Sequence, residues 1–237
     1  MKFTDGYWKT REGLTVLRGT QIVGVRTSAD TLTAYVAAGR VAGRGDTLNR
    51  PLLTVTLTGV ADGVIRVRLA HHLGGLPAHP RFDVAGEGGS VVEGRTLTAG
   101  RLSATFADDG DWLLTFRDGD RVVTSSIPRS IAHVTGPEGT FTHEQLTLDV
   151  GEYVYGLGER FGAFAKNGQV VAIWNEDGGT CSAQASKNVP FSVSNRGYGV
   201  FVENPGDVSF VVASEKVERV QFSLPGEEVT YDIIYGE

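Results

Sequence analysis

The amino-acid sequence predicts an all-β fold, an antiparallel β-sandwich of two packed sheets, and three observations support it. Apolar and polar residues alternate with a period of two along most of the chain, which places successive side chains on opposite faces of a strand. Short turns that contain glycine separate the alternating runs. No window of 12 residues carries the apolar stripe of a helix. Many short strands joined by turns are typical of two stacked antiparallel sheets.

The first half of the chain supplies four alternating runs, which predict strands at residues 31–36, 53–57, 63–69 and 101–106. Two hairpins are expected next, because Asp109-Gly110 and Asp118-Gly119 interrupt the alternation. Glycine accepts the positive φ that a tight hairpin turn requires. We therefore expect these strands to pair with their neighbours in sequence.

The second half continues the pattern with a hairpin from 191–194 to 198–202 and with strands at 208–212, 217–224 and 229–234. The glycine-rich stretches 39–45 and 86–94 are interpreted as loops. No repeat, low-complexity segment or linker divides the sequence. We therefore predict a single domain over residues 1–237.

Charge and cysteine content exclude several classes of function. The net charge of −6 provides no general attraction to phosphate backbones or anionic lipid, so we expect no nucleic-acid and no membrane partner. No apolar stretch approaches the ~20 residues of a membrane helix, and the charged N-terminal residues do not resemble a signal peptide. Cys181 is the only cysteine, which excludes an intramolecular disulfide. A soluble, cytoplasmic protein is the expectation.

Motifs that would carry catalysis by themselves are not found. The glycines of residues 156–162 miss the dinucleotide-binding spacing, and no Gly-Lys pair provides a phosphate-binding loop. His71, His72 and His79 are candidate metal ligands, but their segment also holds two prolines and is interpreted as a loop with solvated histidines. The sequence therefore predicts no metal and no cofactor. Most aspartates lie in turns beside glycine, where the side chain bonds its own backbone. Asp108, Asp109, Asp111, Asp118 and Asp120 are therefore interpreted as turn formers.

One segment has the chemistry of a carbohydrate site. Residues 174–180 read WNEDGGT, a large aromatic residue with acids and flexible glycines between two strand-like segments. Aromatic rings lie against sugar faces, and Asn or Asp side chains bind hydroxyl groups. The candidate substrate-binding residues are Trp174, Asn175 and Asp177. The alternative is a surface loop whose Trp174 is anchored in the core, followed by Cys181 as an unreactive, largely buried thiol.

Four motifs that occur in this order carry a family resemblance. They are YGLGERF at 155–161, WNEDGGT at 174–180, KNVPF at 187–191 and NRGYGV at 195–200. Together they resemble the N-terminal β-sandwich of glycoside hydrolase family 31, most closely its bacterial α-xylosidases. The resemblance spans essentially the whole chain and implies the galactose-mutarotase-like form of the sandwich.

The resemblance also implies a division of labour. Members of this family hydrolyse α-linked sugars with retention, and both catalytic aspartates lie in a (β/α)₈ barrel that follows the sandwich, so no catalytic residue is expected in this chain. The expected partners are that barrel and an α-linked oligosaccharide. The segment 174–180 matches a loop on the leaving-group side of the pocket, where Asp177 would contact a hydroxyl. Residues 155–161 would serve the junction with the barrel, with Glu159 paired to Arg160 and Phe161 packed.

Three alternatives stay open at this point. The chain could be an autonomous, lectin-like module with Trp174 and Tyr198 stacked on sugar. It could equally be the N-terminal domain of an α-glucosidase of the same family, or a scaffold for assembly of the parent enzyme. Self-association of the isolated sandwich is a further expectation, because separation from a barrel exposes apolar surface.

Overall fold

The computed structural model describes residues 2–5, 9–48, 50–72, 89–174, 185 and 187–236. Within them the fold is almost entirely β, with nineteen strands and one 3₁₀-helix, η1 (Arg44–Thr47). All strand pairs are antiparallel, as the alternation and the turn residues predict. In this part of the chain, no helix has the length and apolar character needed to cross a membrane.

One layer of the sandwich is a single eight-stranded sheet. Its order is β13 (Val154–Gly156), β15 (Phe191–Ser194), β16 (Tyr198–Val202), β19 (Glu228–Tyr235), β5 (Val64–Ala70), β4 (Leu52–Ala61), β3 (Thr31–Ala37) and β2 (Gln21–Thr27). The sheet joins the two halves of the chain where β19 pairs with β5.

The other layer consists of two sheets. A six-stranded sheet has the order β1 (Thr15–Arg18), β11 (Ala132–Gly136), β12 (Gly139–Thr147), β18 (Arg219–Pro225), β17 (Val208–Val212) and β14 (Gln169–Ile173). A five-stranded sheet has the order β10 (Arg121–Ser126), β9 (Leu114–Asp118), β8 (Leu102–Phe106), β7 (Thr96–Ala99) and β6 (Ser90–Glu93).

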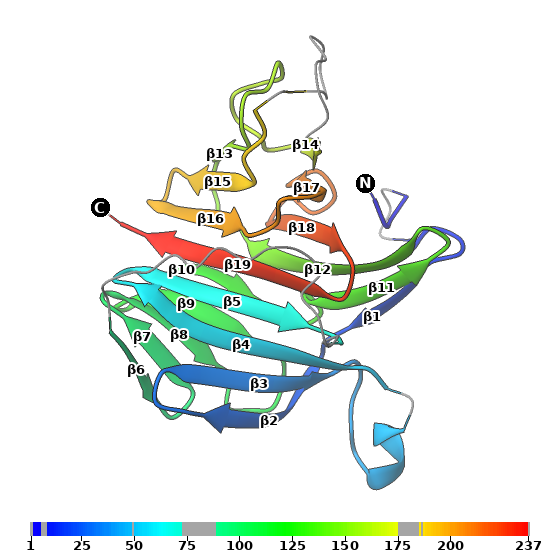
Figure 1. The fold of residues 1–237 in the computed structure, drawn as a ribbon, viewed down its shortest axis with the longest axis vertical. Helices are drawn as coiled ribbons and strands as arrows, with labels where there is room; N and C mark the ends of the chain where they lie inside the picture. The colour runs from blue at the N-terminus through cyan, green and yellow to red at the C-terminus, as the bar shows by residue number, and fades with distance from the viewer. Residues whose placement is uncertain are drawn as a thin grey trace.

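The predicted sandwich is confirmed, with its second layer divided in two (Figure 1). The two sheets of that layer meet at β10 and β12. Thr124 Oγ1 donates a hydrogen bond to the Thr147 carbonyl, and the Ser125 amide donates one to Thr147 Oγ1; both are 2.9 Å long. The eight-stranded sheet contacts both, through β4 against β6 and β7 and through β19 against β12 and β18.

The core follows from the period-two pattern. Leu32, Ala34 and Val36 of β3 are completely buried, and alternate residues of β5 are buried in the same way. The largest fully buried side chains are aromatic: Trp112, Tyr231, Phe106, Phe116, Phe210 and Phe222. Burying one large apolar side chain contributes ~1.5–3 kcal/mol. The alternating runs therefore hold the layers together.

The predicted hairpins are confirmed at Gly110, Gly119 and Gly197, each with positive φ. The prediction of a strand from residue 217 is wrong at its start. The strand β18 begins at Arg219, because residues 213–218 form a turn in which Ala213 has φ +48° and the Arg219 amide donates to the Lys216 carbonyl. Val217 is 81% exposed on this turn. Its β-branched side chain favours a strand, so the sequence did not indicate the turn.

Candidate functional site

The segment predicted to contact sugar begins where β14 ends. Trp174 directly follows this strand and is half-buried. Asn175 and Asp177 lie outside the described residues, as does Cys181. Their roles therefore stay predictions, and the structure describes instead the base from which the segment departs.

That base is closed by one side chain. Asn188 Nδ2 donates hydrogen bonds to the carbonyl oxygens of Trp174, at 3.0 Å, and Ala185, at 2.6 Å. The Asn188 Oδ1 in turn accepts a hydrogen bond from Arg160 Nη2, and Arg160 Nε donates to the Leu157 carbonyl at 3.2 Å. Three of the four sequence motifs thus meet around the base of the 174–188 segment, which we call the loop base.

Backbone contacts fix the loop base from the other side. The Leu157 amide donates to the Phe191 carbonyl at 2.8 Å, and the Glu159 amide donates to the Lys187 carbonyl at 3.0 Å. Gly158 lies between them with φ +82°, and a Cβ at this position would lie 2.4 Å from the Lys187 carbonyl oxygen. Only glycine combines this φ with so close a backbone approach.

The charged residues of the first motif have partners on the third. Glu159 Oε1 lies 3.4 Å from Lys187 Nζ, with both side chains largely exposed, and Arg160 donates to Asn188. The structure thus gives each member of the expected Glu159–Arg160 pair a contact with the 187–191 motif. The sequence offered no signal for this, because the partners are about thirty residues apart.

Exposed apolar side chains accompany the loop base. Phe161 is 68% exposed, Phe164 is 80% exposed and Val189 is 46% exposed. The Phe164 ring packs against the Tyr155 ring with centroids 5.0 Å apart. Tyr198, which the lectin-like alternative would stack on sugar, is by contrast buried, and its hydroxyl donates to Glu152 Oε1 at 2.6 Å. That part of the alternative is wrong, because β16 faces the core here.

Among the described residues, Glu144 and Glu152 are buried carboxylates that accept hydrogen bonds from uncharged donors, whereas a third, Asp232, pairs with Arg66. Glu144 is fully buried, and it accepts hydrogen bonds from Ser126 Oγ, the Gln145 amide and Tyr231 Oη at 2.7–3.0 Å. Burial raises the pKa of Glu144 to about 7, against the opposing effect of these hydrogen bonds. Glu152 accepts from the Ser194 and Tyr198 hydroxyls at 2.6 Å. Both carboxylates are enclosed by their donors, so their role is structural.

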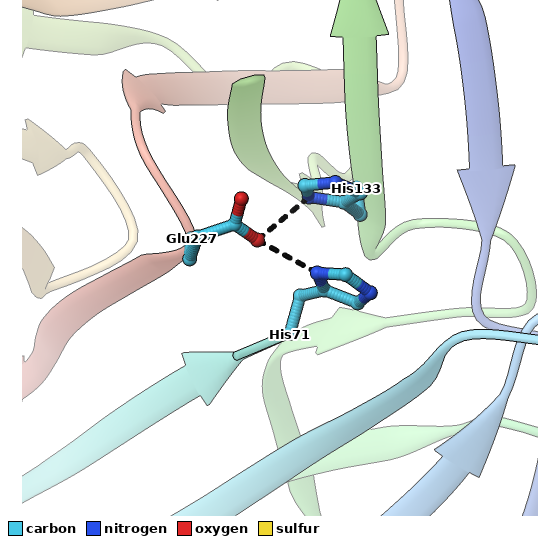
Figure 2. Close-up of side chains that lie close together, drawn as sticks. All are labelled: His71, His133 and Glu227. Atoms are coloured by element: carbon cyan, nitrogen blue, oxygen red, sulfur yellow. Dashed lines mark hydrogen bonds and ion pairs between the residues drawn. The ribbon is translucent and has the colours of Figure 1, made fainter. Parts of the chain in front are cut away.

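A third group of polar side chains could hold a metal ion. His71, His133 and Glu227 bring their ligand atoms within 4.8 Å of one another (Figure 2). Of the three histidines considered as ligands from the sequence, only His71 belongs to this group; His72 follows it as an exposed residue, and His79 lies outside the described residues. No sequence spacing indicates the group, because its members come from distant parts of the chain.

The comparison with known families agrees with this architecture. Residues 54–210, more than half of the chain, match the family described as the glycosyl hydrolase 31 N-terminal galactose mutarotase-like domain. The chain belongs to this family. The matched range contains all four motifs, so the resemblance predicted from the sequence is confirmed.

Curated relatives of this glycosyl hydrolase 31 domain are much longer than the chain. It is 39% identical over 244 residues to the α-xylosidase XylQ of Lactiplantibacillus pentosus, covering 100% of the chain and 32% of the relative. It is 38% identical over 268 residues to an α-xylosidase of Emericella nidulans, covering 100% and 34%. The chain therefore spans about a third of the length of these relatives.

Solved structures share the fold of this glycosyl hydrolase 31 domain at low sequence identity. A dextranase of Flavobacterium johnsoniae, solved with glucose, matches with a TM-score of 0.69 and 16% identity over 93% of the chain and 27% of that structure. An α-xylosidase from a soil metagenome, solved with xylose, matches with a TM-score of 0.61 and 18% identity over 90% and 32%. These matches support the fold alone.

Proposed function

We propose that the chain is the non-catalytic N-terminal domain of a retaining α-glycosidase, an α-xylosidase that releases α-xylose from oligosaccharides. The observation that carries this proposal is the 39% identity along the whole chain to a protein named as an α-xylosidase, of which the chain covers 32%. Burial removes Glu144 and Glu152 as candidates for a sugar-binding surface.

In this proposal the sandwich acts on catalysis through the segment 174–180. Trp174, Asn175 and Asp177 would contact the leaving-group side of the substrate, in a pocket whose chemistry belongs to the catalytic barrel. A loop can orient a sugar and exclude water only when its base is rigid. The bonds of Asn188 to Trp174 and Ala185, together with Arg160, supply that rigidity.

The exposed residues Phe161, Phe164 and Val189 would pack against the barrel beside the loop. Large apolar side chains left exposed on one part of a surface are typical of contact sites. Two remaining expectations, a cytoplasmic location and self-association of the isolated chain, stay predictions.

The test compares the 237-residue chain with the full-length protein that carries it. We expect the full-length protein to hydrolyse a chromogenic α-xyloside with a higher kcat/KM than the matching α-glucoside, and the 237-residue chain to hydrolyse neither. A reversed preference would instead indicate an α-glucosidase. Turnover by the purified chain alone would contradict the non-catalytic role, and tight oligosaccharide binding by it would support the lectin-like alternative.

A further inference from the structure

We propose that His71, His133 and Glu227 form a binding site for a divalent first-row transition-metal ion, for which Zn²⁺ is the probe. This inference is independent of the proposed glycosidase role, because the site is defined by its own three side chains. We infer a bound ion and no reaction.

The fold brings the three residues together where the two layers meet. His71 directly follows β5 of the eight-stranded sheet, His133 lies on β11 of the six-stranded sheet, and Glu227 lies in the turn between β18 and β19. The His71 amide donates to the Glu227 carbonyl at 2.8 Å, which ties the first residue to the third.

The turn that carries Glu227 is also fixed to β12, the neighbour of β11. The Gly226 amide donates to the Thr140 carbonyl at 2.8 Å, and Thr142 Oγ1 donates to the Gly226 carbonyl at 3.0 Å. The strand register pairs Thr142 with His133. All three candidate ligands therefore project from backbone that is held by hydrogen bonds, as a preorganised metal site requires.

The side chains converge on one oxygen atom. Glu227 Oε2 lies 2.7 Å from His71 Nδ1 and 3.5 Å from His133 Nδ1 (Figure 2). The two imidazole rings stack with centroids 3.9 Å apart and an interplanar angle of 17°, and each presents its Nδ1 to Glu227 Oε2. To share one ion, the His71 ring has to turn out of this stack.

The two distances to Glu227 Oε2 are close to those around a tetrahedral ion. Zn–N and Zn–O bonds of about 2.0–2.2 Å place neighbouring ligand atoms roughly 3.3 Å apart at the tetrahedral angle. The 3.5 Å between Glu227 Oε2 and His133 Nδ1 is already close to this separation. The 2.7 Å between Glu227 Oε2 and His71 Nδ1 has to widen by less than ~1 Å to reach it. The side chains of Glu227 and His71 can make this adjustment, because they are 34% and 28% exposed.

His133 supplies an independent observation that points to a ligand. Its side chain is only 4% exposed, and its Nδ1 has no hydrogen-bond partner. Beyond the 3.5 Å approach of Glu227 Oε2, no hydrogen bond satisfies this buried nitrogen, and a metal ion between the two atoms would do so.

The ligand chemistry selects the class of ion. Two imidazoles with one carboxylate suit Zn²⁺, Co²⁺ or Ni²⁺, whereas Mg²⁺ and Ca²⁺ prefer oxygen ligands. The partial exposure of His71 and Glu227 leaves a route for the ion and room for water at the remaining coordination position.

The test is a competition titration of Zn²⁺ into the EDTA-dialysed 237-residue chain with a chromophoric chelator. We expect one ion per chain. His71→Gln, His133→Gln and Glu227→Gln should each weaken Zn²⁺ binding at least tenfold. His72→Gln is the matched control, because it removes an exposed neighbouring histidine outside the group, and it should change the affinity less than twofold.

Substituted Co²⁺ provides a second measurement, since its visible absorption reports coordination by the protein. We expect the visible absorption of protein-bound Co²⁺ to be weaker in Glu227→Gln than in the wild type. The far-ultraviolet circular dichroism spectrum of the variant should be unchanged. If His133→Gln does not fold, the Zn²⁺ affinities of His71→Gln and Glu227→Gln, whose side chains are partly exposed, test the proposal. Binding of less than one ion per chain, or equal losses in His72→Gln and His71→Gln, would overturn the proposal.

Discussion

Arg160 donates a hydrogen bond from its guanidinium to Asn188 Oδ1, and this contact locks the side chain that closes the loop base. Asn188 then has both of its polar atoms engaged, because its Nδ2 donates to Trp174 and Ala185. The two residues come from motifs that look like ordinary loop sequence. Their pairing explains why both motifs accompany the 174–180 segment.

The first prediction concerns this contact. Asn188→Ala removes three hydrogen bonds and leaves Arg160 with one partner fewer, so it should lower the free energy of unfolding by ~1–3 kcal/mol. Lys187→Ala is the matched control, because its ion pair with Glu159 is exposed and should contribute less than ~1 kcal/mol. Urea unfolding of the 237-residue chain measures both, and equal effects would show that Asn188 does not hold the loop base.

The second prediction concerns Gly158, which has positive φ and approaches the Lys187 carbonyl. Gly158→Ala should lower the free energy of unfolding by at least ~2 kcal/mol, because it adds a steric clash to an unfavourable backbone conformation. Gly151 has φ +71°, and no atom lies within 4 Å of the place that a Cβ would take there. Gly151→Ala should therefore cost only ~1–2 kcal/mol from the backbone conformation. A larger loss at Gly151 than at Gly158 would contradict the close approach.

Much of the fold could be predicted from the sequence because its information is local. The turn at Gly119 connects β9 and β10 as the Asp-Gly pair indicates, and alternate residues of β3 are buried as their period indicates. The division of the second layer could not be predicted, because it depends on which strands pair across long stretches of sequence, such as β12 with β18.

The candidate sites were less accessible to sequence reasoning. The strand β12 is buried on both faces from Phe141 to Leu146, so a period-two pattern could not reveal that Glu144 is enclosed. His133 and Glu227 join His71 only through sheet pairing between distant strands. Local patterns indicate strands and turns, whereas these groups depend on which strands become neighbours.

The third prediction follows from the raised pKa of Glu144. The unfolded chain ionises this carboxyl near its ordinary value of 4.5, whereas the folded protein holds the proton until about pH 7. Below pH 4.5 the carboxyl is protonated in both states, so it does not lower the free energy of unfolding. As the pH rises from 4.5 to 7, the carboxyl ionises in the unfolded chain but not in the folded protein, and the free energy of unfolding falls. The loss is on the order of 3 kcal/mol.

Glu144→Gln removes the titration while keeping the shape of the side chain. We expect the wild-type chain to lose more unfolding free energy than the variant between pH 5 and pH 8, in urea titrations at constant ionic strength. Subtraction of the two profiles cancels the other titrating groups, which both proteins share. Parallel profiles would show that Glu144 ionises in the folded protein as it does in the unfolded chain.

The last prediction concerns the substrate role proposed for Asp177. A lost polar contact to a sugar hydroxyl costs ~1–3 kcal/mol in the transition state, so Asp177→Ala in the full-length protein should lower kcat/KM for an oligosaccharide by ~5- to 150-fold. The effect should be smaller with a chromogenic α-xyloside, whose leaving group lacks the hydroxyls that the loop would contact. Asp109→Ala is the control, because Asp109 is exposed and binds the Asp111 amide within a hairpin turn. A change of less than twofold for Asp177→Ala, or an equal change for Asp109→Ala, would remove Asp177 from the substrate site and leave the loop a structural role only.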